Sequence, residues 1–229
     1  MDSILERTAA MIPIVGIPVL QNHERLQRVL DSIDYPIDKL IILDQSGKKN
    51  WKPIQPDSVN ELIVWNFPYA MGVATSWNII IKATPFASHW IFLNDDIIFP
   101  AGSLAKLAEQ AQANTDKIVI PVVARFSAFS IGEGVIEKLG LFDEQFFPMY
   151  YEDTDYLHRC WHHGVQILEI DCPVHHETSS TINKDGYADK NSQTFPRLHN
   201  YHMSKLQNGR YDAGDGWSLR VRRDNSWGR

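Results

Sequence analysis

The sequence predicts an α/β protein whose helices cover a mixed, mostly parallel β-sheet. Three observations carry this prediction. Short apolar runs alternate with segments of helical periodicity over the first half of the 229-residue chain, as in βαβ units. Hydrophobic residues make up 44% of the chain and charged residues 22%, which is the balance of a folded globular protein. Polar residues follow the predicted strands directly, where open parallel sheets bind their ligands.

Four strands are expected in the first half, because each is a short apolar run bounded by polar or turn residues. They cover Ile12–Val19, residues 40–43, residues 61–67 and His89–Leu93. After the first strand, Asn22 is expected to cap a helix whose apolar positions 26, 29, 30 and 33 share one face. Residues 45–60 are expected to form a loop, and apolar positions 73, 77, 80 and 81 predict a second helix.

The second half is less regular but keeps the alternation. Helices are expected through positions 104–111, at 135–139 before Gly140, at 153–163 before Gly164 and at 195–207, with strands at 117–123 and 165–170. The polar segment 178–193 is expected to order over a bound ligand, as lids do. No repeat or linker interrupts the sequence, so we expect one domain over residues 1–229, with a core at 12–210 and a tail at 211–229.

Composition excludes several classes of protein. With 28 acidic and 22 basic side chains the net charge is −6, so neither bulk nucleic-acid binding nor a polybasic anchor is expected. The apolar run at 11–20 has ten residues, two of them proline, whereas a transmembrane helix needs about 20. Two cysteines, Cys160 and Cys172, are too few for a disulfide framework and favour a reducing, cytoplasmic location.

Asn94-Asp95-Asp96 follows the fourth predicted strand. Two adjacent carboxylates repel one another, and a divalent cation relieves that repulsion. Hard oxygen ligands suit Mg²⁺ or Mn²⁺. The alternative is a simple turn, since Asn and Asp are favoured turn residues.

Two later motifs also carry charge. Glu152-Asp153 begins a predicted helix, where acidic residues either stabilise the first turn or, in an aromatic setting, supply a general base. His175-His176 ends a predicted strand. Histidine is a common metal ligand, although such a pair can also be surface or core filler.

Taken in this order, these motifs resemble those of inverting glycosyltransferases of the GT-A fold, in the large family that includes rhamnosyl- and galactofuranosyltransferases. The resemblance covers residues 12–210 and is carried by segments 16–19, 43–47, 72–78, 94–96 and 140–156. Asn94 stands where the family pattern has the first Asp of its Asp-x-Asp motif.

The resemblance implies a role for each site residue. Asp153 is expected to be the catalytic base. Asp96 and His176, preferred over His175, are expected to hold Mn²⁺ or Mg²⁺. Substrate contacts are expected from Pro18, Leu20 and Asp44 at the nucleobase, from Trp77 and Asn78 along the sugar diphosphate, and from Asn94, Asp95 and Glu152. The donor would be a UDP- or dTDP-linked sugar, and the acceptor a hydroxyl of a glycan or glycoconjugate.

Other functions remain open at this point. A retaining glycosyltransferase would share the fold and the metal motif without needing Asp153 as a base. A non-catalytic sugar- or nucleotide-binding module would share the fold alone. A nucleotidyltransferase is less suited, because no Gly-rich phosphate loop is found near the N-terminus. The Gly-x-Gly-x-x-Gly fingerprint, the P-loop and the Gly-x-Ser-x-Gly elbow are also missing.

Overall fold

A seven-stranded sheet with the order β3-β2-β1-β4-β7-β6-β8 forms the centre of the molecule. The computed structural model describes residues 11–48, 51–176 and 187–213. The strands are β1 Ile12–Val19, β2 Ile37–Asp44, β3 Val59–Asn66, β4 His89–Leu93, β6 Ile118–Pro121, β7 Ala128–Gly132 and β8 Ile167–Ile170. Only β7 runs antiparallel to its neighbours β4 and β6. The prediction of a mixed, mostly parallel sheet is confirmed.

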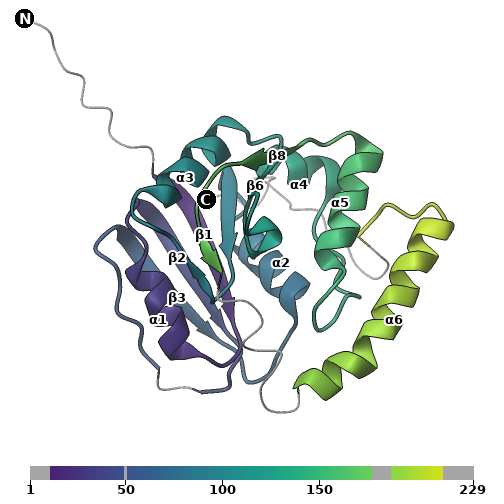
Figure 1. Cartoon of the computed structure of the whole chain (residues 1–229), viewed down its shortest axis with the longest axis horizontal. Helices are drawn as coiled ribbons and strands as arrows, with labels where there is room; N and C mark the ends of the chain where they lie inside the picture. Colours follow the sequence, from purple (N-terminus) through teal and green to yellow (C-terminus); the bar gives the residue numbers. More distant parts are fainter. Residues whose placement is uncertain (1–10, 49–50, 177–186, 214–229) are drawn as a thin grey trace, which may run out of the picture.

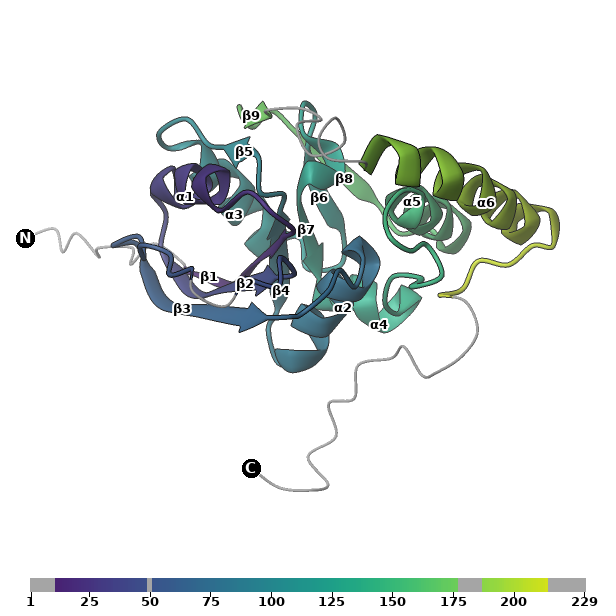
Figure 2. The same cartoon turned by 90° about the horizontal axis from the view of Figure 1, so that it is seen from below.

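Helices cover both faces of this sheet (Figures 1 and 2). Helices α1 (His23–Asp31) and α3 (Ser103–Ala113) lie on one face, and α2 (Val73–Ala83) and α4 (Glu133–Leu139) on the other. Because strand side chains alternate between faces, the core divides into two clusters: Val15 packs with α1, and its neighbour Ile14 packs with α2. The two longest helices, α5 (Glu152–His163) and α6 (Tyr187–Gln207), lie side by side at the β8 end.

The elements differ from the sequence prediction mainly where tertiary pairing decides. β2 begins at Ile37 rather than at position 40, because its first residues pair with the start of β1. β7 was not predicted, nor was the two-residue strand β5 (Ile97–Ile98). It pairs with β9 (His175–His176), a two-residue strand at the place where the sequence predicted the end of a strand. Such strands are too short for a periodicity signal. Asn22 caps α1 as expected, accepting a hydrogen bond from the Arg25 backbone at 3.0 Å.

The C-terminal region is only partly covered. α6 begins at Tyr187, well before the predicted start at 195, and continues past Pro196. The predicted lid at 178–193 lies partly outside the described residues, because 177–186 are not described and 187–193 belong to α6. Residues 214–229 of the predicted tail are likewise not described. No helix in the described part of the chain is long and apolar enough to cross a membrane.

A buried charge network ties α6 to the rest of the fold. Lys205 of α6 is 1% exposed, and its Nζ lies 2.8 Å from Asp143 Oδ2 and 2.7 Å from Asp155 Oδ1. The hydroxyl of Tyr201 donates to the same Asp143 oxygen at 2.9 Å. Arg159, fully buried on α5, lies 3.8 Å from Asp155 Oδ2. We call Asp143, Asp155, Arg159, Tyr201 and Lys205 the α5–α6 charge network.

We expect Lys205→Met to destabilise the protein by about 3–5 kcal/mol, because it leaves buried carboxylates without their main cation. The measurement is the free energy of unfolding from urea denaturation. Lys138→Met, the same change at an exposed position of α4, should shift it by no more than about 0.5 kcal/mol. Equal stability of the two variants would show that the network contributes nothing.

Candidate active site

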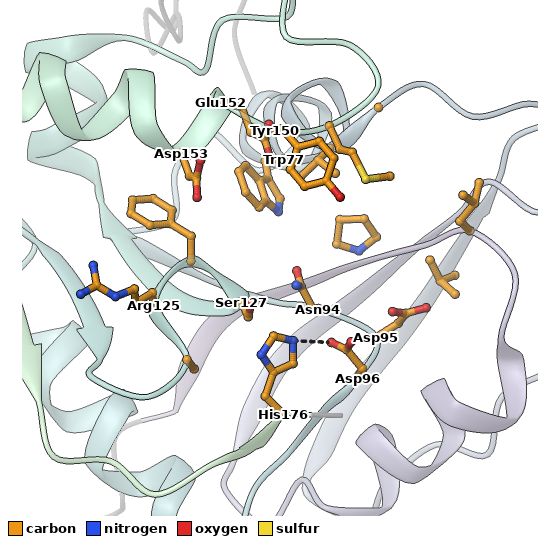
Figure 3. A pocket seen from close by; sticks show the side chains of 18 of the residues that line it. Trp77, Asn94, Asp95, Asp96, Arg125, Ser127, Tyr150, Glu152, Asp153 and His176 are labelled. Atoms are coloured by element: carbon orange, nitrogen blue, oxygen red, sulfur yellow. Dashed lines mark ion pairs between the residues drawn. The ribbon is translucent and has the colours of Figure 1, made fainter. Parts of the chain in front are cut away.

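A cavity of about 530 Å³ opens beyond the carboxyl ends of β1 and β4 (Figure 3), within the range of small-molecule sites. These strands are parallel neighbours, and the chain after β1 builds the sheet towards β3 before returning to add β4 on the other side. Ligands of open α/β sheets bind at such a switch point. The lining includes all the predicted site residues except two: Pro18, Leu20, Trp77, Asn94, Asp95, Asp96, Glu152, Asp153 and His176.

Arg25 relieves the repulsion within the Asp95-Asp96 pair. Its guanidinium is buried, and Nη2 lies 2.6 Å from Asp95 Oδ1 while Nε donates to the Asp95 carbonyl at 3.1 Å. Burial raises the pKa of Asp95, and the bond from Arg25 opposes that rise. The sequence interpretation assigned this compensation to a metal ion alone. The structure shows that a side chain on α1 performs it for one of the two carboxylates.

Asp96 faces His176 across the short β5–β9 sheet. Ile97, next to Asp96, pairs with His176, which places His176 Nε2 3.2 Å from Asp96 Oδ1. His176 lines the cavity, whereas His175 is exposed and absent from the lining. Adjacent strand residues face opposite sides, which explains why only one of the two histidines enters.

A carboxylate and an imidazole nitrogen at this separation fit a divalent cation whose remaining ligands are water or phosphate oxygens. No group of three or more His, Cys, Asp or Glu side chains suited to a metal is found among residues 11–48, 51–176 and 187–213. The described residues therefore offer two candidate ligands at this point of the cavity, Asp96 and His176. Further ligands would come from a bound substrate, as is usual for Mg²⁺.

The opposite wall of the cavity is the start of α5, and its entry is conformationally strained. Tyr150 and Tyr151 have φ values of 80° and 71°, which non-glycine residues rarely adopt. The side chain of Tyr151 is held by α6: its hydroxyl lies 2.9 Å from His199 Nδ1, and its ring packs against Phe195. Strain of this kind is typical of functional sites, and here it directly precedes Glu152 and Asp153.

Glycine at position 72 lets α2 approach this strained segment. Gly72 has a φ of 88°, and a Cβ there would lie 2.9 Å from the Phe147 ring and 3.0 Å from the Pro148 carbonyl oxygen. The next backbone N–H, of Val73, donates to the same carbonyl at 3.0 Å. The first turn of α2 is thus fixed to the segment that leads into α5. Trp77 lies in the next turn of α2.

Glu152 and Asp153 differ in environment although they are adjacent. Glu152 is 7% exposed, and burial together with the neighbouring Asp153 charge raises its pKa to about 8. Asp153 is half-buried, and its Oδ1 accepts from the backbone N–H of Thr154 at 2.6 Å and from the Thr154 hydroxyl at 3.2 Å. Its Oδ2 has no hydrogen bond among the described residues. Figure 3 shows Asp153 across the cavity from Asp96 and His176.

Two predicted site residues do not line the cavity, because the fold uses their polar atoms elsewhere. Asn78 is buried and holds the segment after α4, exchanging hydrogen bonds of 2.9 Å with the backbone of Phe142. Asp44 is also buried: Oδ2 lies 2.9 Å from His23 Nε2, and Oδ1 accepts from the Ser46 backbone at 2.9 Å. The expectation that these two side chains reach a ligand directly is not supported by their positions.

Several lining residues were missed by sequence reasoning. Segment 122–127 borders the cavity with exposed Val122 and Val123 and with Arg125, whose φ is 49°. The strand before it ends at Pro121 rather than at 123. Had the strand been predicted to end at Pro121, segment 122–127 would have followed a strand end directly, where site residues are expected. Gln45 also lines the cavity, and it holds the segment before α2 by accepting from the Met71 backbone at 2.5 Å.

Comparison with known proteins identifies the fold. No family model and no curated protein matches the chain. Among solved structures it is similar to glucosyl-3-phosphoglycerate synthase from Mycobacterium tuberculosis in complex with Mn²⁺, UDP and glucosyl-3-phosphoglycerate, at 13% identity and a TM-score of 0.56, covering 92% of this chain and 84% of that one. The same enzyme with Mn²⁺, UDP and phosphoglyceric acid gives a TM-score of 0.57, again at 13% identity and covering 91% and 81%.

Residues 1–349 of TarS from S. aureus match with a TM-score of 0.50 at 11% identity, covering 71% of this chain and 59% of that one. Identities this low show the fold alone. The chain therefore has the GT-A fold, the α/β architecture of these neighbours.

Proposed function

We propose that this protein is a metal-dependent inverting glycosyltransferase that moves a sugar from a nucleotide diphosphate to a hydroxyl of a glycan or glycoconjugate. One observation carries the proposal: a single cavity at the switch point of a GT-A fold holds the Asp96–His176 pair on one side and the Asp153 carboxylate on the other. UDP accompanies Mn²⁺ in the M. tuberculosis structures described above and Mg²⁺ in a further structure of the same enzyme, which supports a nucleotide-sugar donor and these two metals. A dTDP-linked donor stays within the proposal.

The chemistry of an inverting transfer assigns each wall a task. Asp96 and His176 would hold the cation, which when bound offsets the negative charge that builds on the departing diphosphate. Asp153, through Oδ2, would accept the proton of the acceptor hydroxyl as that oxygen attacks the anomeric carbon. Because attack and departure take place on opposite faces of the sugar, placing these groups on opposite walls suits one in-line displacement.

The ends of β1 and β4 would position the donor. Pro18 and Leu20 are half-buried at the cavity edge and would contact the nucleobase. Asp44 would act through the adjacent turn, holding His23, whose ring stacks on Trp51 at 4.3 Å. Asn94, whose backbone is tied to Ser127 at 2.8 Å, and Asp95 would border the ribose and diphosphate, with Arg25 keeping Asp95 in place.

We further propose residues 1–229 as one catalytic domain that works in the cytoplasm. Both cysteines are free and buried, and they lie in different core clusters, Cys172 in that of α1 and α3 and Cys160 in that of α2 and α4. Thiols placed in this way suit a reducing compartment.

Asp153→Asn should lower sugar transfer by at least the ~10²-fold typical of a lost general base. Donor and metal binding should change little, since the lost proton acceptor acts in the transition state. Turnover by nucleotide release and donor affinity by calorimetry measure the two effects. Asp57→Asn, an exposed position, is the matched control. Near wild-type transfer by Asp153→Asn would remove the base assignment, and retention of the anomeric configuration by NMR would refute inversion.

Affinity for UDP or dTDP should rise on adding Mn²⁺ or Mg²⁺. Both Asp96→Ala and His176→Ala should abolish that rise, because each removes one of the two ligands proposed among the described residues. His175→Ala is the matched control and should keep the rise, since that side chain is outside the cavity. Calorimetry with Mn²⁺ and with EDTA checks the prediction. Equal nucleotide affinity in both, or loss of the rise in His175→Ala alone, would contradict it.

A further inference from the structure

Two buried polar groups in the cavity wall have no hydrogen-bond partner among the described residues: the indole Nε1 of Trp77 and Oε2 of Glu152. Trp77 is 2% exposed and Glu152 is 7% exposed. Leaving such a group unpaired away from water is costly. Both residues line the cavity, so a ligand bound there, in place of cavity water, can satisfy them.

Packing alone does not account for the indole N–H of Trp77. Trp90, the other tryptophan in the same core cluster, donates its Nε1 to Thr84 Oγ1 at 2.8 Å, so this core can supply a partner to a buried indole. Trp77 makes ring contacts with Phe92, Phe129 and Phe142, which a phenylalanine would make as well. Its N–H is the part of the side chain that the core does not use.

The two groups belong to the same wall. Trp77 stands on α2 and Glu152 begins α5, and the bond from Val73 N to the Pro148 carbonyl joins the entries of these helices at 3.0 Å. Figure 3 shows both on the side of the cavity opposite to Asp96 and His176, with the indole nitrogen turned toward its open centre. A ligand whose diphosphate sits near Asp96 would therefore extend its sugar toward this wall.

Glu152 presents a neutral acid on this wall. Burial and the Asp153 charge raise its pKa to about 8, and Tyr150 stands beside it with a pKa that is itself raised. The other charged groups of the lining are Asp95, Asp96, Arg125 and His176. At neutral pH the carboxyl keeps its proton, so, like the unpaired N–H of the Trp77 indole, it can donate a hydrogen bond to a ligand.

We propose that Trp77 and Glu152 form a subsite of two neutral hydrogen-bond donors that binds hydroxyl groups of the transferred sugar and selects hydroxylated over deoxy sugars at those positions. The inference rests on the proposed function and deepens it. An anionic sugar is disfavoured, because Asp153 lies next to this subsite and its carboxylate would repel the added charge. A site built to bond a hydroxyl rejects the analogue that lacks it, because its own buried groups stay unpaired.

The experiment compares the accepted nucleotide sugar with its monodeoxy versions. The wild type should use at least one monodeoxy donor about 10- to 100-fold less efficiently in kcat/KM. Trp77→Phe and Glu152→Leu should each lower kcat/KM for the parent donor while leaving the corresponding monodeoxy donor unaffected, which brings their ratio close to 1. Glu152→Gln keeps a neutral donor and should keep the discrimination. Lys138→Met is the surface control, and affinity for the bare nucleoside diphosphate should not change in any variant.

The pH dependence gives a second readout. Discrimination by the wild type should decline as the pH rises through about 8, where Glu152 ionises, and discrimination by Glu152→Gln should stay level over the same range. Equal losses for parent and monodeoxy donors in Trp77→Phe and Glu152→Leu would overturn the subsite. The subsite would also be overturned if Glu152→Gln lost discrimination as fully as Glu152→Leu and the discrimination by the wild type did not change up to about pH 9.

Failure of the proposed function has a different signature. If the wild type turns over no nucleotide sugar, transfer is refuted, and the same parent and monodeoxy donors are then compared by calorimetry. Selective loss of parent-sugar affinity in Trp77→Phe and Glu152→Leu would still support the subsite. Binding in which parent and monodeoxy donors are equivalent, or binding of neither, would overturn it.

Discussion

The ion pairs of Lys205 are the contact on which the candidate site depends most. Its buried ammonium joins α6 to Asp155 on α5 and to Asp143 in the segment after α4. With Arg159 opposite Asp155, two cations face two carboxylates, so the network is neutral as a whole but leaves no member replaceable on its own. It sets where α5 lies, and α5 carries Glu152 and Asp153 at its first two positions.

The two walls of the cavity are built in different ways. The α5 wall is held by α6: Tyr150 and Tyr151 have strained backbone angles, and their side chains contact Phe195 and His199 of that helix. The opposite wall depends on two-residue strands, β5 and β9, that bring His176 to Asp96. The proposed donor, with its diphosphate near Asp96 and its sugar near Trp77, would connect the two walls.

Arg25 changes how the paired aspartates are understood. Adjacent carboxylates after a strand indicate that a cation is bound nearby. In this protein the guanidinium of Arg25, on the helix that Asn22 caps, is the cation that pairs with Asp95. Asp95 is thereby fixed as part of the cavity wall, and Asp96 is the carboxylate that faces His176. The division of labour follows from the position of α1 on one face of the sheet.

The sequence by itself determined the α/β class, the four first strands, the main helices and the strand-end positions where site residues cluster, because apolar periodicity and turn residues act locally. It also identified Asp96, Asp153 and His176 as site candidates, which the structure brings to one cavity. Tertiary structure alone decided the rest. Asn78 and Asp44 form hydrogen bonds within the fold itself, and β7 pairs with β4. The pKa of Glu152 is raised because the fold buries its carboxyl group.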